Sequence, residues 1–345
     1  MKSPDMKSLD MKSLDMKSLD MKSLDMKSLN AKGEGGLQWR EFLQAYSTYV
    51  VLAALIAVAC AMSRDFRTSQ NISNLLSQIS VVGILAIGQM MVMLTGGFDL
   101  GHGSYVSLVS VLFACFLPMG MTAAIVLVAA SFLVLGAVNG FFVNKGVSSF
   151  IVTLGAMGVA RSLALFLAKG NAVNLTDQSI KFLAYGDVYG VPVCVALWLF
   201  LVVVSTLALR DTKIGRHVYA YGGNPESARL SGVNTKAVIY FVFVVSALLS
   251  VAAGLIYVAK LGVALPNMAV GYEMDSIAGS VIGGTSLFGG VGSVPKTLVG
   301  VLIYGMITNL LNIMGVSAYW QDVAKGLIVL VTVYFNSRKW GARGL

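Results

Sequence analysis

Long apolar runs are the feature that most limits what this chain can fold into. Runs such as residues 121–143 and 191–209 are almost entirely apolar, and about 20 such residues suffice for a helix to cross a bilayer. Only 12% of the 345 residues are charged, whereas a soluble domain carries about 25%. This is too little charge to cover a water-exposed surface. The sequence therefore predicts an all-α membrane protein with many spans.

The apolar runs predict about ten membrane helices, and two of them are short and rich in glycine. These two are expected to be half-spanning or broken helices, so the expected count is eight to ten. Glycine pairs such as Gly136/Gly140 and Gly279/Gly283 would allow neighbouring helices to approach closely. The expected spans are 42–62, 72–95, 102–117, 121–143, 148–168, 191–209, 235–259, 274–288, 297–315 and 322–337.

The first 30 residues repeat a pentamer, MKSPD once, MKSLD four times and MKSLN once. A period of five matches neither a helix nor a strand, and the segment has no apolar core typical of a signal peptide. We expect residues 1–41 to form a disordered tail and lead-in. Residues 42–337 would form the membrane domain, and residues 338–345 a C-terminal tail.

The distribution of Lys and Arg predicts the orientation, because cytoplasmic loops are richer in both. With ten spans and the N-terminus inside, the inner segments hold 18 Lys and Arg, and the outer loops hold five. Without the repeat, the inner count is still 12. Both termini are therefore expected in the cytoplasm.

Several functions are not expected from this sequence. The net charge of +9 is not arranged as a basic patch among aromatic residues, so we expect no nucleic-acid binding. The three cysteines lie in apolar runs without a CxxC pair, so we expect no metal site. Residues 290–297 (GVGSVPKT) resemble a phosphate-binding loop, but Pro295 stands at the second glycine position. We expect neither ATP binding by this chain nor an enzyme, since no catalytic motif is present.

The longest polar interruption of the membrane region is residues 210–234, on the predicted inner side. Gly222 and Gly223 are expected to break the chain there. Asn224 and Pro225 then predict the start of a short helix, with Asn as the N-cap and Pro in the first turn. Such a helix could dock into another protein, while the alternative is a solvated loop with a structural turn.

Two glycine-rich stretches, residues 95–104 and 283–293, fall at membrane depth. Irregular backbone is tolerated there only inside protein or beside a cavity, and paired interruptions point to a transport path. The alternative is close helix packing with turns. The candidate path residues are Gly96, Gly97, Asp99, Ser104, Arg161, Glu273, Asp275, Gly283, Gly284, Thr285, Ser286, Gly289 and Gly290.

Few charged residues lie near the spans. Asp99, Glu273 and Asp275 fall near expected helix ends, where pairing or capping explains them better than a proton relay. Arg161 is the most interior charge in the sequence, and we expect it to pair with a carboxylate or with backbone carbonyls.

The chain resembles the membrane-spanning permease subunit of bacterial ABC importers for sugars of the ribose, xylose and galactose type. Five stretches carry the resemblance, in the order that the family has them. They are GILAIGQMMVMLTGGFDLGHGS (83–104), SFIVTLGAMGVARSLAL (149–165), GRHVYAYGGNPESARLSGVN (215–234), GYEMDSIAGSVIGGTSLFGGVGS (271–293) and YWQDVAKGLIVL (319–330).

The resemblance implies that residues 210–234 contact a cytoplasmic ABC ATPase, with the short helix as a coupling helix. It also implies a homodimer in the inner membrane, with the sugar path between two copies, and a periplasmic sugar-binding protein that delivers the sugar. ATP and Mg²⁺ would be bound by the ATPase, so no cofactor is expected in this chain. The residues that match the coupling motif are Gly215, Arg216, Gly222, Gly223, Asn224, Pro225, Glu226, Ala228 and Arg229.

The first glycine-rich motif departs from the pattern GGIDLSVGS that is usual in the family. Phe98, Gly101 and His102 stand here in place of Ile, Ser and Val. These departures weaken any transfer of a particular sugar. One alternative function is an ion-coupled secondary transporter, in which Asp99 would bind the ion or proton, and another is a membrane enzyme, for which we find no polar catalytic cluster.

Overall fold

The computed structural model describes residues 47–341. The predicted disordered tail and residues 342–345 lie outside the described part of the chain. The contacts divide the chain into two units, residues 1–50 and 51–345. The boundary falls within an apolar helix, Ser47–Met62, whose first four residues are the only described part of the first unit. The following description concerns the second unit.

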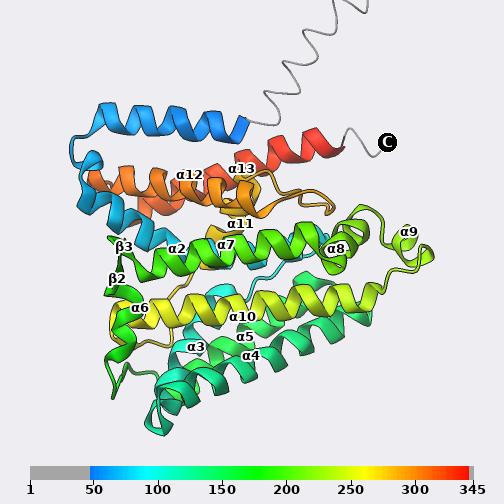
Figure 1. The fold of residues 1–345 in the computed structure, drawn as a ribbon, viewed down its shortest axis with the longest axis horizontal. Helices are drawn as coiled ribbons and strands as arrows, with labels where there is room; N and C mark the ends of the chain where they lie inside the picture. The colour runs from blue at the N-terminus through cyan, green and yellow to red at the C-terminus, as the bar shows by residue number, and fades with distance from the viewer. Residues whose placement is uncertain (1–46, 342–345) are drawn as a thin grey trace, which may run out of the picture. The chain divides into compact units, whose positions relative to one another are not determined.

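The second unit is mostly helical, with two small strand pairs in its loops (Figure 1). The α-helices are α2 (Ser69–Leu94), α3 (His102–Phe116), α4 (Met121–Asn144), α5 (Ser149–Leu167), α6 (Phe182–Tyr185), α7 (Val193–Asp211), α8 (Lys213–Gly223), α9 (Pro225–Leu230), α10 (Thr235–Leu261), α11 (Tyr272–Ile282), α12 (Val294–Ile313) and α13 (Ala318–Gly341). The 3-10 turns are η1 (Asp65–Arg67), η2 (Leu117–Met119) and η3 (Ser179–Lys181). Strand β1 (Val173–Asn174) pairs antiparallel with β4 (Val263–Ala264), and β2 (Asp187–Val188) with β3 (Val191–Pro192).

Seven helices in the described part of the chain are long and apolar enough to cross a membrane. They are α2, α3 together with η2, α4, α5, α7, α10 and α12. The Ser47–Met62 helix is apolar but shorter, and α11 has only 11 residues. The prediction of many apolar helices is confirmed, while the count of ten spans and the orientation of the termini stay predictions.

Helices α2 and α10 form the centre of the unit. Every residue from Ile79 to Leu94 of α2 is buried, and α10 packs against α2, α3 and α4. The α4–α10 contact depends on glycine, since a Cβ on Gly136 would lie 2.7 Å from the Cα of Val244. The predicted close approach at this glycine is confirmed.

Helices α11 and α12 also pack through glycine. A Cβ on Gly300 would lie 2.1 Å from the carbonyl oxygen of Gly279, and one on Gly283 would lie 2.5 Å from that of Lys296. Larger side chains would push these two helices apart. The predicted close approach at Gly279 and Gly283 is therefore confirmed as well.

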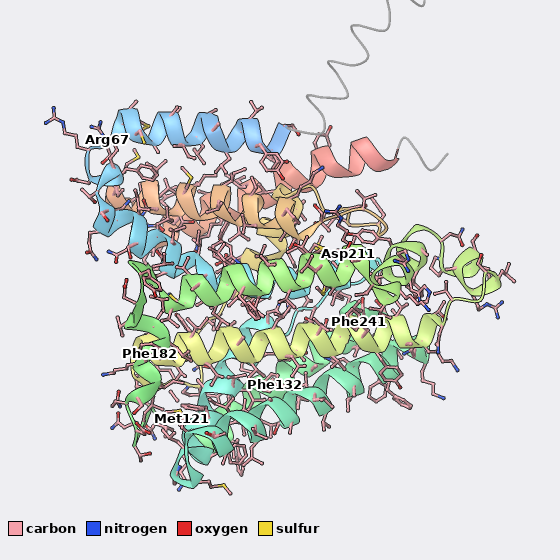
Figure 2. The ribbon with its side chains drawn as sticks, viewed as in Figure 1. Arg67, Met121, Phe132, Phe182, Asp211 and Phe241 are labelled. Carbon is pink, nitrogen blue, oxygen red and sulfur yellow. The ribbon has the colours of Figure 1, made fainter. Side chains whose placement is uncertain are left out.

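Apolar side chains cover the outside of the helices, and charged side chains gather near the helix ends (Figure 2). Arg67 and Asp211 mark two such ends. Helices α4 and α5 are 22% and 17% buried over their most apolar stretches. An apolar surface of this kind suits contact with lipid or with another membrane chain.

Two sequence-based expectations are corrected, one on the end of a helix and one on the long polar loop. The helix expected over 274–288 ends at Ile282 because the chain turns at Gly283 and at Gly284, whose φ is 89°. Helix α13 continues to Gly341, into the segment expected as a C-terminal tail from residue 338, and the expected domain bounds stay predictions. The long polar loop is largely helical, because α7 extends to Asp211 and α8 follows. The all-α class holds except for the two strand pairs.

Candidate functional site

The first glycine-rich stretch forms an irregular segment between α2 and α3. Its backbone is supported by hydroxyl groups of α5. The amide of Phe98 donates to Ser149 Oγ at 3.1 Å, and the amide of Leu100 donates to Thr153 Oγ1 at 3.1 Å. This irregular backbone is satisfied inside the protein, as its position at membrane depth requires.

Asp99 lies at the centre of a buried polar network. Its carboxylate accepts hydrogen bonds from the amide of Gly101 at 3.0 Å and from Ser246 Oγ of α10 at 2.8 Å. His102 connects the same serine to α11, with Nε2 3.0 Å from Ser246 Oγ and Nδ1 3.2 Å from Ser276 Oγ. Asp99 therefore anchors the irregular segment to α10, as the expectation of pairing or capping described.

The second glycine-rich stretch is a compact loop between α11 and α12. The amide of Ser286 donates to the carbonyl of Val291 at 2.8 Å, and the amide of Phe288 donates to Ser286 Oγ at 3.1 Å. Gly289 and Gly290 have φ values of 91° and 72°, which side chains with a Cβ rarely adopt. The loop therefore requires glycine at these two positions.

The predicted short helix forms as α9. Asn224 caps it, with Oδ1 accepting from the amide of Ser227 at 2.9 Å, and Pro225 stands in the first turn. Glu226 and Arg229 form an ion pair at 2.6 Å, and both side chains are about 65% exposed. The hydrogen bonds from Arg229 hold the pKa of the Glu226 carboxyl below its ordinary value. The helix thus presents a paired, exposed charge cluster to its surroundings.

The three glycine-rich segments meet backbone to backbone. We call their meeting point the glycine junction, made of Leu94–Gly96 after α2, Gly222–Gly223 at the end of α8, and Gly289–Gly290. The amide of Gly290 donates to the carbonyl of Leu94 at 2.9 Å. A Cβ on Gly222 would lie 1.9 Å from that carbonyl oxygen and 2.5 Å from the amide nitrogen of Gly290.

A side-chain contact strengthens the glycine junction. The hydroxyl of Tyr219 in α8 donates to the carbonyl of Gly292 at 2.9 Å. At its other end, α8 is capped by Thr212, whose hydroxyl accepts from the amide of Gly215. A Cβ on Gly215 would lie 2.1 Å from the carbonyl oxygen of Leu209, so α8 folds tightly against α7 and extends to the junction.

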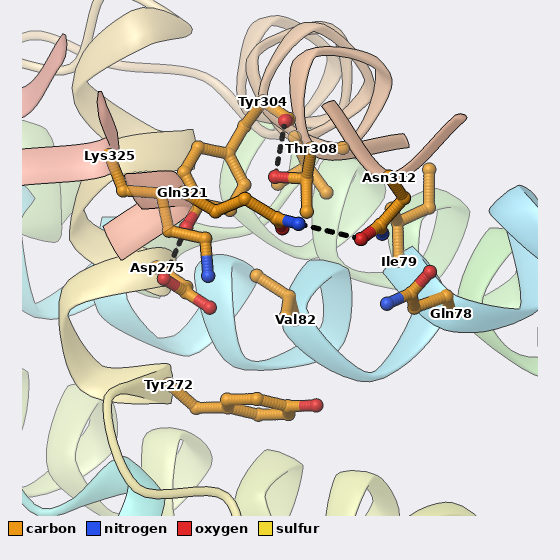
Figure 3. Close-up of a pocket in the computed structure, with 12 residues that line it drawn as sticks. Gln78, Ile79, Val82, Tyr272, Asp275, Tyr304, Thr308, Asn312, Gln321 and Lys325 are labelled. Atoms are coloured by element: carbon orange, nitrogen blue, oxygen red, sulfur yellow. Dashed lines mark hydrogen bonds between the residues drawn. The ribbon is translucent and has the colours of Figure 1, made fainter. Parts of the chain in front are cut away.

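The remaining candidate residues lie elsewhere. Ser104 is in the first turn of α3, and Glu273 is close to the same turn, since a Cβ on Gly103 would lie 2.3 Å from Glu273 Oε2. Asp275 lies in a separate cavity with Tyr304 (Figure 3). Arg161 lies within α5 and is exposed in this single chain, and its expected pairing with a carboxylate or with backbone carbonyls stays a prediction.

Several contributors to these sites had not been predicted from the sequence. Ser149 and Thr153 support the first irregular segment, and Ser246 binds Asp99. The sequence gives little indication of these roles, because a serine or threonine in an apolar helix does not stand out from other small residues in the hydrophobic pattern. Tyr219 could have been recognised more easily, because it is an aromatic residue with a hydroxyl group close to Gly222 and Gly223 in the sequence.

The chain matches the family model described as "Branched-chain amino acid transport system / permease component" over residues 71–333. Among similar proteins is the ribose import permease protein RbsC of Haemophilus influenzae, 38% identical over 86% of this chain and 96% of the relative. The D-allose transport system permease protein AlsC of Escherichia coli is 34% identical, covering 85% and 91% of the two chains. The L-arabinose transport system permease protein AraH of Escherichia coli is 33% identical, covering 86% and 92%. No solved structure matches the chain.

The family match covers most of the membrane region, and the relatives align over nearly their whole length. All three relatives named above are permeases. Together with the seven apolar helices, they identify a multi-pass protein of the inner membrane. The chain belongs to the family of transport-system permease components.

Proposed function

We propose that this chain is the membrane-spanning permease subunit of an ATP-driven ABC importer for a monosaccharide. Relatives named for ribose, D-allose and L-arabinose support a sugar as the substrate class. A separate cytoplasmic ABC ATPase binds ATP and Mg²⁺ and hydrolyses the ATP. This chain then needs no cofactor and no catalytic residue, because it supplies a path that alternates between two conformations.

The glycine junction is the observation that carries this proposal. Helix α8 lies between the exposed helix α9 and the two glycine-rich segments (Figure 1). Because Gly222 touches Leu94 and Gly290 without an intervening side chain, a displacement of α8 is passed directly to backbone at both segments. In the proposed mechanism, closure of the ATPase moves α8 and α9, and the irregular segments change the access to the path.

Two further partners belong to the proposal. A periplasmic sugar-binding protein delivers the sugar to the outer side and supplies most of the specificity. A second copy of the permease completes the transporter, and the poorly buried apolar surfaces of α4 and α5 are suited to that copy or to lipid. Both termini lie in the cytoplasm.

The geometry of Asp99 does not favour an ion-coupled mechanism. A carboxylate that binds a transported ion must release its protein partners or share them with the ion. Asp99 is 1% exposed, and its two oxygens accept from Gly101 and Ser246. These contacts support a structural role for Asp99.

The test is uptake of labelled sugar by proteoliposomes that contain the permease and its ATPase. Glu226→Gln combined with Arg229→Gln is expected to abolish ATP-dependent uptake while the permease still folds, because the exposed helix α9 loses its charges. Lys236→Gln, which changes an exposed cation outside α9, is the control and should retain uptake. Uptake driven by an ion gradient without ATP, unchanged in the double variant, would refute the proposal.

A further inference from the structure

A polar cavity lies between α2, α11, α12 and α13 (Figure 3). On α2 and α11, its lining residues lie away from the helix ends that lead to the glycine junction. Its volume is about 260 Å³, just below the range of about 300–1,000 Å³ that is typical of drug-sized ligands. The cavity therefore suits a ligand smaller than a drug.

The walls of the polar cavity offer both donors and acceptors. Asp275 accepts a hydrogen bond from the hydroxyl of Tyr304 through one oxygen, Oδ1. Gln321 is 8% exposed, and its Nε2 donates to Asn312 Oδ1 and to the carbonyl of Val316, both at 2.8 Å. Within residues 47–341, no hydrogen bond occupies its own amide oxygen or Oδ2 of Asp275, so both can accept from a ligand.

The lining of the polar cavity carries one charge of each sign. Asp275 contributes one carboxylate and Lys325 one ammonium group, and the Lys325 side chain is 27% exposed. Lys325 also contacts Asp322 at 3.2 Å, outside the cavity. A strongly anionic ligand would meet the carboxylate, and a cationic one would meet the ammonium group, so a neutral ligand with many hydroxyl groups fits best.

One side of the polar cavity is aromatic. The ring of Tyr272 lies across the cavity from Gln321 and Asn312 (Figure 3). Such a ring gives a flat apolar surface with a polar tip. Its face can cover the apolar C–H face of a sugar ring while the amides and the carboxylate bind the hydroxyl groups.

The position of the polar cavity fits the entry of a ligand from outside. On the predicted topology, α11 and α13 begin at the outer side, and α12 ends there. Tyr272 and Asp275 lie in the first turn of α11, and Gln321 and Lys325 in the first two turns of α13. The residues of α12 that line the cavity extend from Val301 to the last turn of the helix, which is its outer end on the predicted topology.

We propose that the polar cavity is a monosaccharide-binding site within one permease chain, in which Asp275, Gln321 and Lys325 bind sugar hydroxyls and Tyr272 covers the sugar ring. This inference rests on the proposed function as a sugar permease. Helix α11 connects the site to the glycine junction, because Asp275 precedes Gly283 by about 12 Å of helix. A sugar in the cavity thus contacts α11, and the loop that follows α11 contributes Gly289 and Gly290 to the glycine junction.

The first test is protection of a thiol in the cavity. Thr308, which lines the cavity, is changed to cysteine in a chain with Cys60→Ser and Cys115→Ser, and the rate of alkylation is measured in detergent without ATPase. Ribose, allose or arabinose at millimolar concentration is expected to slow the reaction at least threefold. The control is Thr176→Cys, at an exposed position in an outer loop, where sugar should have no effect.

The second test is the concentration dependence of ATP-driven uptake by proteoliposomes. Asp275→Asn and Gln321→Leu are each expected to raise KM about tenfold or more, because a sugar hydroxyl loses its partner. Asp187→Asn, at an exposed turn, should leave KM unchanged. Co-purification of each variant with the ATPase verifies that it has folded.

The outcomes separate the two proposals. Protection of Thr308→Cys together with raised KM supports the site. ATP-driven uptake of a sugar that neither protects Thr308→Cys nor depends on Asp275 and Gln321 overturns the site, while the proposed function stands. Absence of ATP-driven uptake of all three sugars by the wild type, without protection, contradicts both.

Discussion

Gly222→Ala is expected to disrupt the glycine junction, although alanine favours helix and Gly222 lies within α8. In an open helical position, Gly→Ala stabilises by about 0.5–1 kcal/mol. Here the added Cβ would lie 1.9 Å from the carbonyl oxygen of Leu94 and 2.5 Å from the amide nitrogen of Gly290. Both neighbours are backbone atoms, so no side-chain rotation relieves the overlap.

The magnitude follows from these distances. Ordinary contact begins at 3.4 Å, so Leu94 and Gly222 must separate by about 1.5 Å. Forcing atoms into a well-packed site costs about 1–3 kcal/mol. If the shift also breaks the 2.9 Å bond from Gly290 to Leu94, about 0.5–1.5 kcal/mol is added. The helix preference of alanine offsets about 0.5–1 kcal/mol of this sum. We therefore expect a net cost of about 0.5–4 kcal/mol, concentrated where α8 meets both irregular segments.

Gly223→Ala provides a matched control. Gly223 is the next residue and also belongs to α8, yet among the described residues nothing lies within 4 Å of a Cβ placed there. This change should be neutral or slightly stabilising. The assays are thermal unfolding in detergent, followed by ATP-dependent uptake in proteoliposomes. Equal stability and uptake for the two variants would refute the packing argument.

Three further predictions concern the network and α9. Ser246→Ala should destabilise the protein by about 1.5–3 kcal/mol, because the buried carboxylate of Asp99 loses a charge-assisted hydrogen bond. Ser250→Ala loses only a hydrogen bond to a backbone carbonyl and should cost less. Equal melting temperatures for the two variants would contradict this prediction. Asn224→Ala should destabilise α9 by about 1 kcal/mol, because the helix loses its N-cap hydrogen bond. Amide hydrogen exchange in residues 225–230 should then be faster than in the wild type, and an unchanged exchange rate would argue against this role of Asn224. Because the pKa of Glu226 is lowered by Arg229, their pairing is complete above the ordinary pKa of a glutamate and is lost as pH falls through the lowered value. Arg229→Gln should raise that pKa in an NMR titration, and an unaltered titration would exclude the pair as its cause.

Much of the fold could be predicted from the sequence because apolar length is a local property. The helix expected over 72–95 forms as Ser69–Leu94, and the one expected over 121–143 as Met121–Asn144. Asn224 and Pro225 fixed the start of α9 for the same reason, since a cap depends on the next three residues. The roles expected for the coupling and path residues stay predictions.

The parts that sequence reasoning missed depend on contacts between distant segments. No local pattern indicates that Gly222 would touch Leu94 and Gly290, because each stretch by itself resembles an ordinary glycine-rich turn. Helix α8 was missed because its polar sequence resembles a loop, and its packing against α7 and the junction stabilises it.

The most direct test of this account is co-purification of the tagged permease from its native membrane in mild detergent, with identification of the bound proteins. The account predicts an ATPase with a phosphate-binding loop in about equal copy number, and ATP-driven sugar uptake by the reconstituted complex. A permease that purifies alone, and that drives uptake in ATP-free vesicles with an ion gradient, would contradict it.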